Sequence, residues 1–240
     1  MSVHEGSFGP PPPLPDQRLA SLARLGALDE RPIGRLAGRR TGEAGNIELV
    51  PWPAQPLGRL RVVHRGATVL VVTDGLSDAW DPSLHVELPN FRYWIELAIE
   101  APVSGDANAP VPAWVAPLLW AASNWLVTQR FDLRARLRHH QCLTLGVMPV
   151  PGLEAWRSHH GVHGTLVGIP FSGETLGAHA VLARDHGDPV WILPMKLLHP
   201  AEYDWAMAVR DASRAVWLTQ AFLLGERHLS RLDRGPVVTP

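Results

Sequence analysis

Short β-branched runs fill the middle of the chain, and apolar residues at helical spacing mark its end. The runs predict strands at residues 47–50, 60–64 and 69–72, with Arg65-Gly66 turning the last two into a hairpin. Similar runs predict further strands at residues 93–100, 141–147, 165–169 and 190–196.

Helical spacing of apolar residues predicts a long helix at residues 113–130, with Pro117 in its first turn. Two more helices are predicted near residues 201–209 and 213–224, and Asp16 would cap a short one near the N-terminus. Strands dominate the middle and helices the end, without strict alternation. The sequence therefore predicts an α+β fold, with a mixed, largely antiparallel central sheet covered by helices in a single domain.

Residues 1–15 have no apolar periodicity and contain four consecutive prolines. We expect this segment to be disordered, with a proline-rich ligand for another domain as the alternative, and residues 16–240 to form the domain. Residues 31–45, rich in Gly and Arg, and residues 104–110 are predicted to be loops.

Composition narrows the classes of function. The 22 Lys and Arg residues balance 23 Asp and Glu residues, so no basic excess points to nucleic acid. No uninterrupted apolar run approaches the length of a membrane span, and no secretory signal is recognisable. The single cysteine, Cys142, excludes an intrachain disulfide. These features favour a cytoplasmic protein that binds neither nucleic acid nor membrane.

One turn carries the most specific pattern. The apolar run at residues 69–72 stops at Gly75-Leu76-Ser77-Asp78, where Gly75 supplies unusual backbone angles and the polar side chains stabilise the turn. Glu96 alternates with apolar neighbours in a predicted strand. A buried Glu96 would need a charged partner, and Arg234 near the end of the chain is one candidate.

From about Gly66 to Gly235 the chain resembles the suppressor-of-fused domain family. The similarity is carried by the Gly-Leu-Ser-Asp turn, by the Glu96 strand and by Trp125, eleven residues after Trp114. Members of this family bind other proteins, and bacterial relatives are proposed to be immunity proteins that neutralise a partner toxin. The resemblance implies a bacterial, single-domain binding module whose partner is another protein, such as a cognate toxin.

In animal relatives, a helix tyrosine and a following Asp-His pair grip a partner peptide. By this resemblance the tyrosine falls on Trp125, and the pair falls on His139-His140, with His139 at the place of the aspartate. Independently, Arg134, Arg136 and Arg138 would share one face of a strand and meet an acidic partner, or protect a strand edge.

Tryptophan is enriched at interface hot spots, so any of Trp80, Trp120 and Trp156 that proves exposed would mark an interface.

Histidines offer the main alternative to a protein-binding module, namely a metal site or an enzyme active site. His159 and His163 stand four residues apart, a zinc-ligand spacing on a helix, but Gly161 and Gly164 favour a surface loop. Cys142 follows His139-His140, which raises a thiol nucleophile as a second possibility. Walker, dinucleotide-binding and serine-elbow motifs are absent.

We therefore expect no enzyme, cofactor or metal. A regulatory scaffold that binds a transcription or secretion factor and a metal-dependent hydrolase remain as alternatives.

Overall fold

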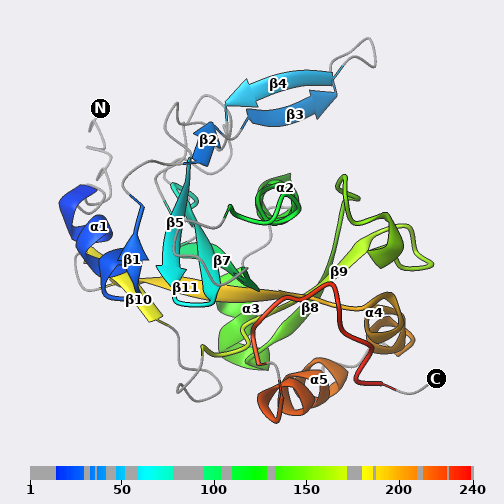
Figure 1. Ribbon diagram of the computed structural model, residues 1–240. Coiled ribbons are helices and arrows are strands. Elements are labelled where there is room, and N and C mark those ends of the chain that lie inside the picture. Colours follow the sequence, from blue (N-terminus) through cyan, green and yellow to red (C-terminus); the bar gives the residue numbers. More distant parts are fainter. Residues whose placement is uncertain are drawn as a thin grey trace, which may run out of the picture.

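A mixed β-sheet runs through the centre of the protein in the computed structural model (Figure 1). The structure describes residues 15–29, 33–35, 37–41, 47–51, 59–77, 94–103, 110–128, 133–171, 180–185, 188–209, 213–225 and 227–238. In these residues the strands of the sheet lie in the order β1 (Ala27–Leu28), β5 (Arg59–Arg65), β6 (Thr68–Asp74), β7 (Ile95–Pro102), β11 (Asp188–Leu197), β9 (His163–Val167) and β8 (Leu143–Val147). In addition, β2 (Ile33–Arg35) pairs with β5, and β10 (Ala180–Asp185) pairs with β11.

Within the described ranges the strand pairs are antiparallel, except that β7 and β11 are parallel. A separate antiparallel pair consists of β3 (Ala37–Thr41) and β4 (Ile47–Pro51). The helices are α1 (Pro15–Ala23), α2 (Val115–Thr128), α3 (Leu133–His140), α4 (Pro200–Met207) and α5 (Ser213–Leu223). The architecture confirms the predicted α+β fold with a largely antiparallel sheet.

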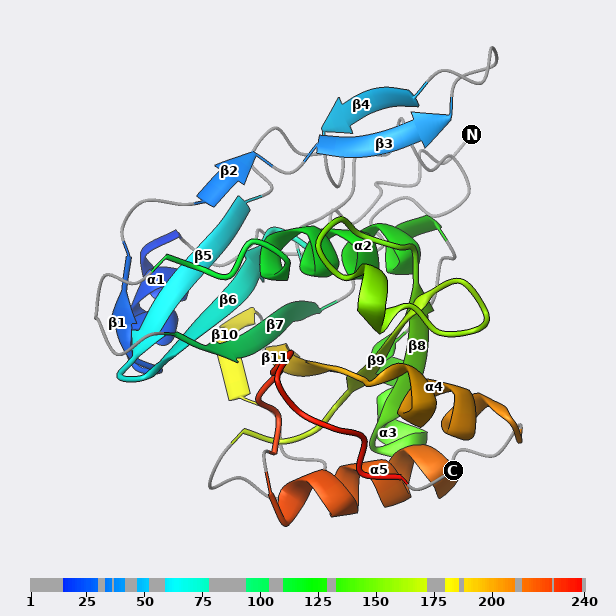
Figure 2. The same ribbon diagram turned by 45° about the vertical axis from the view of Figure 1, so that its right-hand side comes forward.

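Alternating side chains of β6 explain how both faces of the sheet are covered. Val69 and Val71 pack into the cluster that contains the apolar residues of α2, whereas Leu70 and Val72 pack into the cluster beside α1. Figure 2 shows α2 above the sheet and α4 and α5 below it. Since both faces are covered, every residue from Val69 to Asp74 is buried.

The cluster beneath β8 and β9 joins α4 and α5 to the sheet. It contains Leu166 of β9, Tyr203 of α4, and Leu218 and Phe222 of α5. Lys196 of β11 is fully buried nearby, where its ammonium group donates to the carbonyl of Leu229 and lies 4.5 Å from the ring centroid of Phe222. These contacts hold α4 and α5 against the sheet.

Most long elements match the sequence prediction. The hairpin turn follows Arg65, with Gly66 at φ +68°, and Pro117 lies in the first turn of α2. The predicted loop at residues 31–45 is wrong at β2 and β3, which hold few apolar residues, and β10 was not predicted. Pro15, which we expected in a disordered segment, begins α1. The predictions for residues 1–14 and 104–109 lie outside the described residues.

Candidate functional site

A buried carboxylate holds the Gly-Leu-Ser turn. Glu96 of β7 is fully buried and accepts hydrogen bonds from the backbone N–H groups of Gly75, Leu76 and Ser77 at 3.0–3.1 Å. The hydroxyl groups of Thr73 and Ser77 donate to the same carboxylate at 2.6 Å. Gly75 has φ +135°, a conformation that favours glycine, so the residue types of the turn follow from its geometry. Asp78, the last residue of the pattern, lies outside the described residues.

Burial dominates the electrostatics of this carboxylate. It raises the pKa of Glu96 to about 7, against the charge of Arg18 and the hydrogen bonds of Ser77 and Thr73, which lower it. Asp74 lies between Arg18, at 3.3 Å, and Arg61, at 2.9 Å. These contacts join α1, β5, β6 and β7 around one turn, so the turn and Glu96 have a structural role.

Arg234 does not pair with Glu96, which corrects the prediction. Its guanidinium binds the carboxylate of Glu202 at 2.6 and 2.7 Å. Glu202 is fully buried and also accepts from the backbone N–H of His199, which forms the capping box at the start of α4. Arg234 further donates to the carbonyl of Leu197, so it anchors the C-terminal segment to the end of β11 and to α4.

A groove runs along β8, at one end of the described sheet. Among the described residues, β8 pairs with β9 on one side and with no strand on the other. The groove has a volume of about 590 Å³. Its lining comprises Trp125, Leu143, Thr144, Leu145, Gly146, His160, Val162, Tyr203 and Met207. Strand β8 and the helices α2 and α4, which carry lining residues on either side of it, are labelled in Figure 2.

The two walls belong to opposite faces of the sheet. Trp125 is partly buried and packs against the cluster under α2, which also holds Leu143 and Leu145. Tyr203 belongs to the cluster on the other face, and Met207 at the end of α4 is 45% exposed. The groove therefore wraps around the outer edge of β8, between an indole and a phenol.

Two glycines make room for Tyr203, which forms one wall of the groove. Gly146 of β8 lies directly opposite Gly164 of β9. A Cβ on Gly164 would lie 2.4 Å from the Cβ of Tyr203, and one on Gly146 would lie 2.3 Å from the Tyr203 hydroxyl. The phenol ring therefore lies flat on the pair, which explains why both positions are glycine.

The three arginines do not share a strand face, because residues 133–140 form α3. Arg134 is buried and Arg138, one turn later, lies near it: their guanidinium carbons are 4.8 and 5.7 Å from the ring centroid of Trp191. Arg136 is exposed on another face of the helix. The predicted acidic-partner stripe and the predicted strand edge are therefore both wrong.

His139 and His140 lie at the end of α3, with ring centroids 4.5 Å apart. Only two residues separate His140 from Leu143, where β8 begins, so the histidine pair lies close in sequence to one end of β8. The lining of the groove, however, includes neither imidazole. Of the residues that the resemblance suggested for binding, the structure places Trp125 alone in the groove.

Cys142 does not form an exposed site with these histidines. It is fully buried in the cluster of α4 and α5, and burial raises the pKa of its thiol against a hydrogen bond with Thr219. A raised pKa disfavours the thiolate, which is the nucleophilic form.

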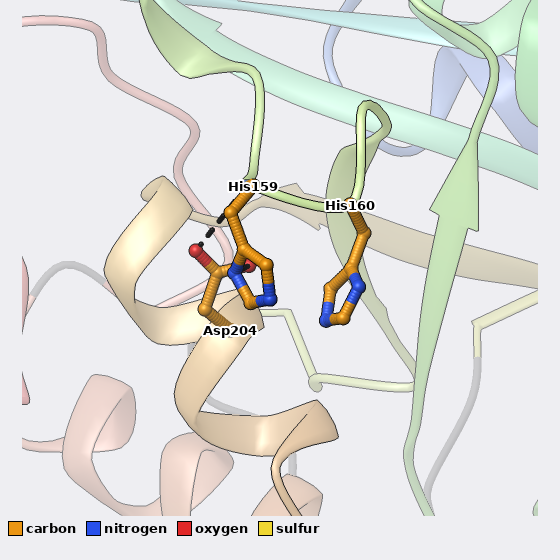
Figure 3. A group of neighbouring side chains, drawn as sticks. All are labelled: His159, His160 and Asp204. Atoms are coloured by element: carbon orange, nitrogen blue, oxygen red, sulfur yellow. Dashed lines mark hydrogen bonds and ion pairs between the residues drawn. The ribbon is translucent and has the colours of Figure 1, made fainter.

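His159 and His163 are separated by their surroundings. His163 of β9 is fully buried, and its Nδ1 lies 3.1 Å from the carbonyl of Trp156. His159 is exposed and lies beside His160 and Asp204 instead (Figure 3). The histidine spacing on which the metal alternative rested is therefore not the spacing that the structure brings together.

Among the described tryptophans the exposed one is Trp217, which is not one of the three that we named. Trp156 is buried, Trp120 is half-buried, and Trp80 lies outside the described residues. Trp217 of α5 is 45% exposed, and its ring lies 5.0 Å from that of Trp205. Sequence reasoning missed Trp217, Tyr203 and Met207, since helical spacing alone does not tell which side of a helix the sheet covers.

No family model, curated protein or solved structure matched the chain. Within the part of the chain that the structure describes, every helix is too short or too polar to cross a bilayer.

Proposed function

We propose that this protein is a non-enzymatic binding domain that takes an extended segment of a partner protein along the outer edge of β8. The observation that carries the proposal is the strand edge itself, unpaired among the described residues and set in a groove of about 590 Å³. A strand edge offers a row of backbone donors and acceptors to another chain. The residue types in the groove then favour apolar side chains on the incoming segment.

Trp125 and Tyr203 support this choice of partner. Successive side chains of an added strand point to opposite faces, so alternate residues would meet the indole of Trp125 and the phenol of Tyr203. Aromatic residues with a polar tip are enriched in protein interfaces because they bury a large area with few rotatable bonds. The lining contains no Asp, Glu, Lys or Arg, so we propose a mainly apolar segment.

The resemblance to suppressor-of-fused domains supports the biological role. We propose a bacterial, cytoplasmic immunity protein whose partner is a cognate toxin, with the groove as the anchor of a standard-sized interface of roughly 1,600 Å². Trp125, which the resemblance aligned with the peptide-gripping tyrosine, is a wall of this groove.

The experiment is co-expression of the protein with the product of the neighbouring gene. We expect protection from toxicity, a stable complex, and loss of at least about tenfold in affinity for Trp125→Ala, because a buried aromatic anchor is worth 2 kcal/mol or more. Trp217→Ala is the matched control, since Trp217 is an exposed tryptophan outside the groove. Absence of both complex and protection, or equal losses in the two variants, would refute the proposal.

A further inference from the structure

We propose that His159, His160 and Asp204 form a binding site for a divalent transition metal of the zinc class. One ligand atom from each residue lies within 4.8 Å of the others. Among the described residues this is the one group of three or more potential His, Cys, Asp or Glu ligands that meets this distance. Two imidazoles and a carboxylate are ligands that zinc commonly takes in proteins.

The turn between Trp156 and His163 brings the two imidazoles together. Adjacent residues of a strand point to opposite faces, but here the ring centroids of His159 and His160 are 3.8 Å apart. The turn is closed by a hydrogen bond from the Gly161 N–H to the Ser158 carbonyl at 3.0 Å, and Gly161 has φ +78°. A tight, hydrogen-bonded turn therefore holds both rings on one side.

Asp204 supplies the third ligand from a rigid element. It lies on α4, whose first turn is fixed by the capping box of His199 and Glu202. Its Oδ2 accepts from the His159 N–H at 3.4 Å. Its Oδ1 lies 2.8 Å from the His159 Nδ1, yet this buried oxygen receives no well-directed hydrogen bond. This oxygen has an unused lone pair, and Figure 3 shows the Asp204 carboxylate against the His159 ring, with the His160 ring on the other side of His159.

Metal binding requires only a small closure. The ligand atoms of tetrahedral zinc lie roughly 3.3 Å apart, since each is about 2.0–2.2 Å from the metal. The side chain of His159 is 65% exposed and His160 is exposed, so both rings can rotate toward Asp204. Three protein ligands leave one position of a tetrahedral ion open to water.

The site would tie the turn to α4 at the rim of the groove. His160 lines the groove, and its ring centroid lies 6.1 Å from that of Tyr203. A bound metal would therefore fix His160 relative to this wall. The inference concerns the free protein and does not depend on the proposed partner.

The test is titration of the full chain, without an added histidine tag, with Zn²⁺ alone by calorimetry, and with Co²⁺ by visible absorption. We expect one ion per chain, a rise in melting temperature of about 5 °C at saturating zinc, and tetrahedral cobalt absorption. His160→Gln and Asp204→Asn should each lower zinc affinity at least about tenfold.

The matched control is the His139→Gln/His140→Gln double variant, which removes the other adjacent histidine pair. It should bind zinc as the unmodified protein does. No binding at 100-fold molar excess of zinc, unchanged affinity in Asp204→Asn, or an equal loss in the control would overturn the inference and leave His159 and Asp204 as a surface ion pair.

Discussion

The side chain of Tyr203 occupies the space that a side chain on Gly164 would need. A Cβ on Gly164 would lie 2.4–2.5 Å from three atoms of Tyr203, its Cβ among them. Because the Tyr203 Cβ is attached to the backbone of α4, the contact cannot be relieved by rotating the ring. This close approach sets the distance between α4 and the sheet, and with it the width of the groove.

Gly164→Ala should therefore lower the free energy of unfolding by about 1–3 kcal/mol, the usual cost of overpacking a core. Gly146→Ala is the matched comparison and should cost less, since its Cβ would meet the hydroxyl at the far end of the same side chain and not an atom next to the backbone. Urea unfolding of both variants measures the difference. A larger loss in Gly146→Ala would show that the ring is not held by Gly164.

Glu96→Ala should lower the free energy of unfolding by at least about 3 kcal/mol, because it leaves three buried N–H groups of the turn without their acceptor. Below pH 4.5, where the Glu96 carboxyl is protonated, Glu96→Gln should cost less, about 1–3 kcal/mol, since one amide oxygen still accepts. Glu154→Gln, at an exposed carboxylate, is the control and should leave stability unchanged. Chemical denaturation gives all three values. If Glu96→Ala leaves the free energy of unfolding unchanged, the carboxylate does not stabilise the turn.

The pKa of Glu96 also predicts a pH dependence. The pKa rises from 4.5 to about 7 in the folded protein, so the folded state binds this proton more tightly and unfolding releases it between these pH values. The contribution of Glu96 is therefore present in full below pH 4.5 and is lost as pH rises through 7, by about 3 kcal/mol in total. The measurement is the difference in unfolding free energy between the unmodified protein and Glu96→Gln across this range. A difference that grows with pH would mean that the hydrogen bonds outweigh burial.

Arg234→Met should cost about 3–5 kcal/mol, because it leaves the buried carboxylate of Glu202 without its cation. The double variant Arg234→Met/Glu202→Gln should be more stable than Arg234→Met alone, since glutamine is neutral and still serves in a capping box. Thermal unfolding compares the two. If the double variant is the less stable, the ion pair is not what makes the single change costly.

Local patterns predicted the hairpin of β5 and β6 and the long helix α2, because each pattern spans several turns or a full alternation. The same patterns wrongly predicted a strand in the segment that forms α3. Arg134, Arg136 and Arg138 alternate as in a strand, yet Leu133 and Leu137 stand one helical turn apart and are both buried. With eight residues the two periods are hard to separate, and packing against Trp191 decides.

The candidate site could be predicted only in part. Trp125 came from the resemblance, but Tyr203 and the Gly146–Gly164 pair belong together only once the strand register is known. The sequence suggests an arginine as the partner of Glu96, whereas backbone N–H groups of a turn supply most of its hydrogen bonds. A sequence identifies side chains, and it does not show which backbone N–H groups will donate to a carboxylate.

Hydrogen exchange of the protein with and without its partner tests the central claim most directly. If a partner segment adds to the outer edge of β8, backbone amides within residues 143–147 must become protected on binding. Protection confined to the surface around Trp217, with exchange at residues 143–147 unchanged, would contradict the account.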